Sequence, residues 1–320
     1  MTRTSDRSTA ILPEAPPLEV VDERVCPVCK SSARKGPLST EGTFSLVRCC
    51  VCGMLYTHKV RNVQAKVRLY EQMAEQRQDS TRPLQRAHYG LANQIKSLRL
   101  YDVVLQLILE RFPTGEIRVV DIGCGGGLLL LAAQVAEDGY NCGVAPRVSV
   151  RGVSIDDRER QETERNVGCL VATPEQASHE WAGWANVVTA MNTLEHVNDP
   201  LALLGHIKRM LQPDGILVVD VPNNFILSHR CALVGRWPPL DIGEHINHFT
   251  PKTLDRLMKT GGFTPQRRLP GRWRGSEALG SKSSVRAMMR WAIARALMAA
   301  TAGRAQVFPH MTMAYKNGSA

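Results

Sequence analysis

Short apolar runs alternate with amphipathic stretches through the middle of the chain, and this pattern predicts strands that alternate with helices. The run at 119–122 is followed by a glycine-rich turn and then by four consecutive leucines. Further apolar runs occupy 151–156, 185–192 and 216–223, and 310–316 alternates as a final strand would. Strands and helices in this alternation predict an α/β fold, in which helices cover both faces of a largely parallel sheet.

The turn after the first strand is the feature most directly tied to chemistry. Its glycines let the backbone turn tightly and approach a ligand closely, which a Cβ atom would prevent. The helix that follows begins with unpaired N–H groups directed at whatever lies over the turn. Asp121, at the carboxyl end of the strand, can accept a hydrogen bond. These features predict a nucleotide-like cofactor at the edge of the sheet.

Three segments together resemble a known family. Residues 119–127 are similar to the first motif of class I S-adenosylmethionine-dependent methyltransferases, in which an acid precedes G-x-G-x-G. Residues 193–200 resemble the fourth motif, and the phrase L-Q-P-D-G before the strand at 216–223 is also characteristic. The resemblance covers about 100–265. It implies a Rossmann-like, seven-stranded methyltransferase sheet with helices on both faces and S-adenosylmethionine as the cofactor.

The resemblance also implies which residues contact the cofactor. Ile155 and Asp156 end the second predicted strand, where an acid suits the ribose hydroxyls, although Asp156 or Asp157 could equally cap the next helix. Two departures from the family pattern are a long loop before Asp156 and the absence of an acid after the third strand. The expected contacts are with Asp121, Gly123, Cys124, Gly125, Ile155, Asp156, Ala172, Asn192 and Leu194.

Two C-x-x-C pairs near the N-terminus predict a structural zinc site. Cys26 and Cys29 form the first pair, and Cys49 and Cys52 form the second. Two such knuckles supply the four thiolates that zinc prefers, whereas a redox site would need only one. Cys50 is expected to be a bystander, and the strand pattern at 43–48 links the pairs. A module this small needs the metal for most of its folding energy.

The chain is therefore expected to contain four parts. Residues 1–22 are rich in Ser, Thr, Pro and Glu and predict a disordered tail. The zinc ribbon is expected at 23–58, a helical linker that covers the cofactor and substrate at 59–112, and the methyltransferase domain at 113–320. Tyr70 and Tyr89 are candidates for lining the cover.

Histidines are the candidate catalytic groups, because a hydroxyl or carbon acceptor must lose a proton and an imidazole titrates near neutral pH. His196 follows the fourth strand. His245 and His248 lie at 243–251, a segment similar to the E-H-x-x-x-F-[ST]-P stretch of small-molecule methyltransferases, including zinc-bearing sugar C-methyltransferases. We favour His245 as the general base. The alternative is that Glu244 and His245 only shape the loop.

Nearly all of the net charge of +10 belongs to the C-terminal segment, where ten bases and one acid follow Gln266. Residues 269–308 predict a basic, amphipathic insertion between the last two strands. The insertion could pack on its own domain, close over an anionic substrate, or contact a membrane surface through 282–300. Aromatic residues make up only 5% of the chain and form no base-stacking platform, so we do not expect nucleic acid as a partner.

Taken together, these patterns predict a cytoplasmic methyltransferase, since the cysteines are odd in number and no apolar run reaches membrane-spanning length. The expected reaction is methyl transfer to a hydroxyl of a small molecule in secondary metabolism, quinone or sugar chemistry, and an anionic or carrier-linked acceptor is one candidate. C-methylation of a nucleotide-linked sugar, RNA methylation and a non-enzymatic, cofactor-binding interaction protein remain as alternatives. The acceptor and the oligomeric state have no readable signature.

Overall fold

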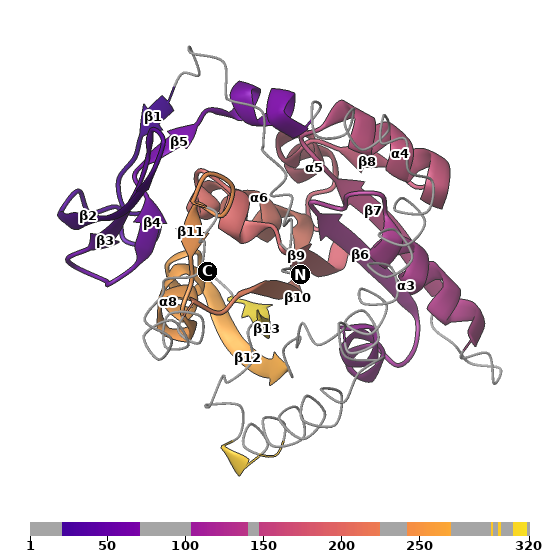
Figure 1. The fold of residues 1–320 in the computed structure, drawn as a ribbon. Helices are drawn as coiled ribbons and strands as arrows, with labels where there is room; N and C mark the ends of the chain where they lie inside the picture. Colours follow the sequence, from indigo (N-terminus) through magenta and orange to yellow (C-terminus); the bar gives the residue numbers. More distant parts are fainter. Residues whose placement is uncertain are drawn as a thin grey trace, which may run out of the picture.

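A computed structural model describes residues 21–70, 104–139, 147–224, 242–269 and 310–318, together with the single positions 296, 300 and 301. Its main feature is a seven-stranded sheet with the order β12-β13-β10-β9-β6-β7-β8 (Figure 1). The strands of this sheet are β6 (Glu116–Ile122), β7 (Arg147–Val153), β8 (Val171–Ala172), β9 (Ala185–Met191), β10 (Leu211–Pro222), β12 (Phe263–Leu269) and β13 (His310–Asn317).

The sheet is parallel at its centre and antiparallel at one edge. β6 pairs in parallel with both β7 and β9, and β9 pairs in parallel with β10. The strand expected at 310–316 is present as β13, which runs antiparallel between β10 and the edge strand β12. The parallel strands share one carboxyl edge, where ligands of open α/β sheets bind. The predicted seven-stranded sheet is therefore confirmed.

Helices cover both faces, because successive side chains of the central strands alternate between two apolar layers. Val120, Val188 and Leu217 belong to one layer, which packs against α6 and α8, whereas Val119 and Val187 belong to the other, beside α3. The helices are α3 (Leu128–Gly139), α4 (Asp157–Val167), α5 (Pro174–Glu180), α6 (Pro200–Met210) and α8 (Pro251–Thr260), with the short turn η1 (Leu194–His196) and further helical residues at 63–70 and 104–111.

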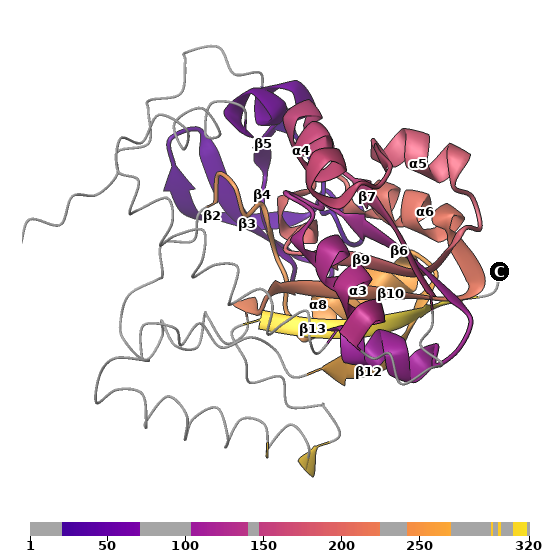
Figure 2. The same ribbon diagram turned by 90° about the vertical axis from the view of Figure 1, so that its right-hand side faces the viewer.

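An N-terminal module of short strands lies beside this sheet (Figures 1 and 2). Its strands are β1 (Val21–Glu23), β2 (Arg34–Glu41), β3 (Phe44–Cys49), β4 (Leu55–Thr57) and β5 (Lys59–Arg61). β1 pairs with β5, so the module extends beyond the boundary predicted at residue 58, and residues 59–61 are strand rather than helix. β2, β3 and β4 form a second sheet, which a distant segment, β11 (Asn247–His248), completes.

Other boundaries also differ from the sequence pattern. The strand predicted at 151–156 begins at Arg147 and ends at Val153, so Ile155 and Asp156 lie beyond it. The turn predicted at 212–215 is incorporated into β10 as an irregularity in its pairing with β9. The tail at 1–20, Tyr89, most of the predicted cover and most of the basic insertion lie outside the described residues. Among the described helices, none has the length and apolar character needed to cross a bilayer.

Candidate functional site

The glycine turn lies at the carboxyl end of β6, and its conformation requires glycine. Gly123 and Gly127 have φ values of +69° and +79°, which other residues rarely adopt. A Cβ atom on Gly123 would lie 2.6 Å from Oγ1 of Thr193, and one on Gly127 would lie 2.4 Å from Val167. The turn is therefore tightly packed between the fourth-motif loop and α4, whereas a Cβ atom on Gly125 would meet no atom within 4 Å.

Asp121 lies beneath this turn rather than on its surface. Its side chain is buried, and its Oδ1 accepts a hydrogen bond from Oγ1 of Thr189 at 2.6 Å. Burial raises the pKa of Asp121 to about 7, so the acid can keep its proton near neutral pH. Burial likewise raises the pKa of Cys124 to about 12, which leaves this thiol unreactive.

Three polar side chains lie between the end of β7 and the first turn of α4. Asp156 is buried and caps α4, because its Oδ1 accepts from the N–H groups of Arg158 and Glu159. Oγ of Ser154 donates to Oε2 of Glu159 at 2.7 Å. The cap is thus the role that the structure gives Asp156. The half-buried carboxylate of Glu159 is a functional candidate that the sequence analysis missed, although its place three residues after a cap was a signal.

The remaining predicted cofactor contacts differ in their exposure. Ile155 is 39% exposed and Ala172, in β8, is 7% exposed. Asn192 has a φ of +54° and donates its N–H to the carbonyl of Asp220, so it occupies a turn at the end of β9. Leu194 was predicted to line the pocket, but it is wholly buried in the apolar layer beneath α6. The turn η1 thus directs this side chain into the core.

His196 and His245 come together although they belong to different loops. Their ring centroids are 4.7 Å apart and their planes meet at 75°. Nδ1 of His196 lies 3.0 Å from the carbonyl oxygen of Glu244, so Nδ1 is the donor and Nε2 carries the lone pair. Burial, and then the neighbouring His245, lowers the pKa of His196 to about 4. The ring is consequently neutral at physiological pH.

The buried carboxylate of Glu195 lies close to the two histidines. One ligand atom each from Glu195, His196 and His245 lies within 4.8 Å of the others, so these residues could hold a divalent metal ion. The backbone places Glu195 beside the second loop, because the N–H of Ile246 donates to its carbonyl at 2.8 Å. His248 is buried in β11, and burial lowers its pKa to about 3. It is not part of this three-residue cluster.

Tyr70 lies near acidic residues of three segments. Burial, together with the charges of Glu244, Glu159 and Glu195, raises its pKa to about 12. Its phenol therefore lies within electrostatic range of both loops and of the Ser154–Glu159 pair.

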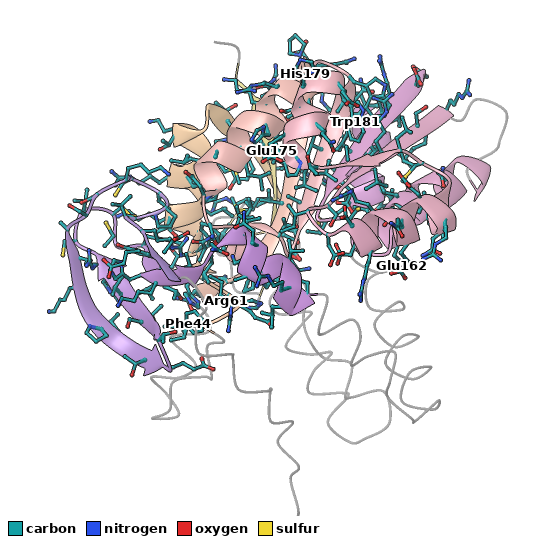
Figure 3. The ribbon with its side chains drawn as sticks, turned by 90° about the horizontal axis from the view of Figure 1, so that it is seen from above. Phe44, Arg61, Glu162, Glu175, His179 and Trp181 are labelled. Carbon is teal, nitrogen blue, oxygen red and sulfur yellow. The ribbon has the colours of Figure 1, made fainter. Side chains whose placement is uncertain are left out.

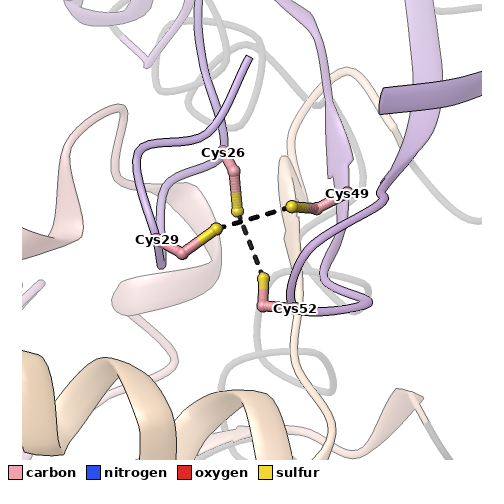
Figure 4. A group of neighbouring side chains, drawn as sticks. All are labelled: Cys26, Cys29, Cys49 and Cys52. Carbon is pink, nitrogen blue, oxygen red and sulfur yellow. Dashed lines mark hydrogen bonds between the residues drawn. The ribbon is translucent and has the colours of Figure 1, made fainter. Parts of the chain in front are cut away.

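The four cysteines of the C-x-x-C pairs converge in the N-terminal module (Figure 4). The Sγ atoms of Cys26 and Cys52 are 3.5 Å apart, as are those of Cys29 and Cys49, and all four lie within 4.8 Å of one another. Four sulfur ligands at these spacings match the donor set of a structural zinc site. Cys50 is exposed and lies outside the cluster, as expected.

Comparisons with known proteins agree with this geometry. A family model described as a methyltransferase domain matches residues 84–267. The chain is 31% identical over 167 residues to a ubiquinone biosynthesis O-methyltransferase of Cereibacter sphaeroides, covering 48% of this chain and 62% of that relative. It is 30% identical over 199 residues to the Aliivibrio fischeri protein of the same name, covering 61% and 80%. The chain thus spans less than two thirds of the first of these relatives.

A solved structure shares the fold. The magnesium protoporphyrin IX methyltransferase of Synechocystis PCC 6803, determined with bound SAH, superimposes with a TM-score of 0.51 at 12% sequence identity. The similarity covers 80% of this chain and all of that one. At this level of identity the comparison concerns the fold alone.

Proposed function

Because this chain belongs to the family of S-adenosylmethionine-dependent methyltransferases, we propose that it methylates a hydroxyl group of a small, quinol-like aromatic acceptor. The observation that carries the proposal is the His196–His245 pair, which lies on loops at the carboxyl edge of the sheet. The names of the curated relatives support a hydroxyl on a quinone precursor as the acceptor class.

The cofactor is proposed to bind over the glycine turn, with its ribose beside the Ser154–Glu159 pair. The open space above Gly125 fits a ligand that approaches the backbone closely. Glu159 is the better candidate for the ribose hydroxyls than Asp156, because Oδ1 of Asp156 already accepts two backbone hydrogen bonds. The bound cofactor would supply an electrophilic methyl group on a sulfonium ion.

His245 is proposed to take the proton of the acceptor hydroxyl, which makes the oxygen a better nucleophile. A base with a pKa of about 4, such as His196, is a weak proton acceptor at neutral pH. His196 is better suited to accept a hydrogen bond through Nε2 and to orient its neighbour. The main contribution of the loops is alignment and exclusion of water, since well-oriented reactants can gain roughly 7–11 kcal/mol.

The same cluster supports a second way to activate the hydroxyl. Glu195, His196 and His245 form a mixed oxygen and nitrogen donor set, and the hydrogen bond from Nδ1 of His196 to a backbone carbonyl is typical of metal-binding histidines. A divalent cation held there would lower the pKa of a bound hydroxyl. Assays with added Mg²⁺ and with EDTA distinguish this mechanism from general-base catalysis.

We further propose that the cysteine cluster holds a structural zinc ion. The four sulfur atoms fit such an ion in kind and spacing, and the strands around them are short. The metal would fix the two knuckles relative to each other and so supply folding energy that the small module lacks. No chemical step is assigned to it.

The test begins with calorimetric titration of the purified protein with S-adenosylhomocysteine. Methyl-labelled S-adenosylmethionine is then offered with catechol, hydroquinone, a nucleotide-linked keto sugar or total RNA. Label transferred to catechol or hydroquinone is the expected result. Transfer to the sugar or to RNA would favour one of the alternatives, and wild-type protein that binds no S-adenosylhomocysteine would contradict the assignment as an enzyme.

A further inference from the structure

The N-terminal module holds the loop that carries His245. β11 pairs antiparallel with β4, so that Asn247 lies opposite Tyr56 and His248 opposite Leu55. Thr57 adds two further bonds, because its N–H donates to the carbonyl of Ile246 at 2.9 Å and its hydroxyl donates to that of Ile242 at 2.8 Å. The loop is therefore built into the sheet of the cysteine module.

Arg24 ties the module to both histidine loops at once. Its Nε donates to the carbonyl of Thr57 at 2.8 Å, its Nη2 to that of Ile246 at 2.6 Å, and its Nη1 to that of Asn198 at 3.0 Å. Three bonds from one planar guanidinium fix the relative position of the segments that they join. Arg24 comes two residues before Cys26, so the first cysteine knuckle anchors this bridge.

Lys66 adds a bridge from the helical residues 63–70. Its side chain is buried, and Nζ donates to the backbone carbonyl of His196 and, at 2.6 Å, to Oδ1 of Asn198. The amide of Asn198 in turn donates to the carbonyl of Arg61 at 2.8 Å. The loop that carries His196 is thus held to the residues that directly follow the module.

Arg61 completes the frame on the other loop. Its Nη1 donates to the carbonyl of Gly243 at 3.1 Å, and its guanidinium lies 4.5 Å from the ring centre of Phe44 (Figure 3). Arg24, Arg61 and Lys66 direct their charges at backbone carbonyls and an amide oxygen of the two loops. Because these three cations form hydrogen bonds inside the protein, they are poorly suited to bind a second macromolecule.

From these contacts we propose that the N-terminal module is a positioning element of the catalytic centre. Arg24 in the module and Lys66 in the helix directly after it set His196 against His245, so that methyl transfer depends on these contacts while cofactor binding does not. The inference rests on the proposed function. Apart from Thr57 in the module itself, the partners of both side chains lie in 194–199 and 242–248, and none belongs to the glycine turn or to the Ser154–Glu159 pair. A shift of about 1 Å in a catalytic group can cost roughly 10²-fold in rate.

The test compares Lys66→Met with Lys66→Arg in the full-length, zinc-containing protein, with Lys35→Met on the exposed strand β2 as the matched control. Long-range ¹H–¹⁵N NMR spectra report the rings of His196 and His245, assigned with His196→Gln and His245→Gln. Lys66→Met should shift both sets of ring signals and leave the zinc content and the Kd for S-adenosylhomocysteine unchanged. With catechol as acceptor, kcat should fall by about 10²-fold at constant KM, and Lys66→Arg should recover much of the loss.

Lys66→Met with wild-type ring signals would overturn the proposal, whether or not catechol is methylated. The NMR experiment therefore separates failure of the positioning role from failure of the proposed function. If only the proposed function fails, the wild-type protein does not methylate catechol, but Lys66→Met still shifts the ring signals. If Lys66→Met does not fold, Asn198→Ala is used instead, because it removes the side chain that accepts from Lys66 and donates to the carbonyl of Arg61. Unchanged ring signals in that variant would likewise contradict the proposal.

Discussion

His196 and His245 meet edge to face, with their ring centres 4.7 Å apart, although one follows β9 and the other belongs to the loop before β11. The backbone carbonyl of Glu244, adjacent to His245, accepts the hydrogen bond that fixes the tautomer of His196. The two rings thus form one unit in which Nε2 of His196 carries a lone pair.

Replacing either histidine should therefore lower methyl transfer without affecting the cofactor. We expect His245→Gln to reduce kcat by about 10²- to 10⁴-fold, the usual contribution of a positioned general base. His196→Gln should have a similar effect. The kcat of the double variant should be only slightly below that of the less active single variant, because the two rings act together. The control is His206→Gln on α6, whose ring contacts Ser178. Fully additive losses would argue against a single unit.

Cofactor affinity should depend on Glu159 more than on the charge of Asp156. Glu159→Gln should weaken binding of S-adenosylhomocysteine by roughly ten- to a hundred-fold, because hydrogen bonds to a charged group are worth about 1.5–3 kcal/mol. Asp156→Asn keeps a side-chain oxygen for the helix cap and should change the Kd little. Calorimetry measures both, with exposed Glu164→Gln on the same helix as the control. The reverse order of effects would return the ribose contact to Asp156.

Zinc should be present at one ion per chain and should depend on each of the four clustered cysteines. Cys49→Ser should release the ion and lower the thermal stability of the module, since four thiolates are needed for a closed tetrahedral site. Metal analysis and a thermal melt measure the two effects. Cys50→Ser changes the adjacent exposed thiol and should retain the zinc. Equal loss from both variants would show that the cluster is not the binding site.

Asp121 should make the protein less stable as the pH rises from about 4 to about 7. Burial raises its folded-state pKa to about 7 from the ordinary value of 3.8, so over this range the folded state keeps a proton that the unfolded state has lost. Each pH unit between these two pKa values lowers the free energy of unfolding by about 1.4 kcal/mol, and the loss becomes constant above the folded-state pKa.

Asp121→Asn removes this titration while it preserves the shape of the neutral acid. The stability of the variant relative to the wild type should therefore increase between pH 5 and pH 6 by about 1.4 kcal/mol. Urea unfolding at the two pH values measures the difference, and effects of other groups, His248 included, cancel in the comparison. A difference between the two proteins that is the same at both pH values would mean that Asp121 is ionised in the folded state.

Much of this molecule follows from local sequence. The glycine turn after 119–122, the helix start at 128 and the strand at 310–316 each depend on a few adjacent residues, and each was predicted and is found. The C-x-x-C spacing similarly predicted the four-sulfur cluster, because each knuckle is a local turn and β3 joins the two. Helix and strand propensity, turn chemistry and the hydrophobic period depend on residues that are close along the chain, so they can be read directly from a single sequence.

The tertiary structure alone decided how these pieces combine. Pairing of β11 with β4, the reach of Arg24 and Lys66 into the histidine loops, and the contact of His196 with His245 all join residues that are distant along the chain. Leu194 turned inward and Asp156 became a cap for the same reason, since the packing around them selected one of several locally acceptable roles. The residue types limit which contacts are possible, and only the folded backbone determines which ones form.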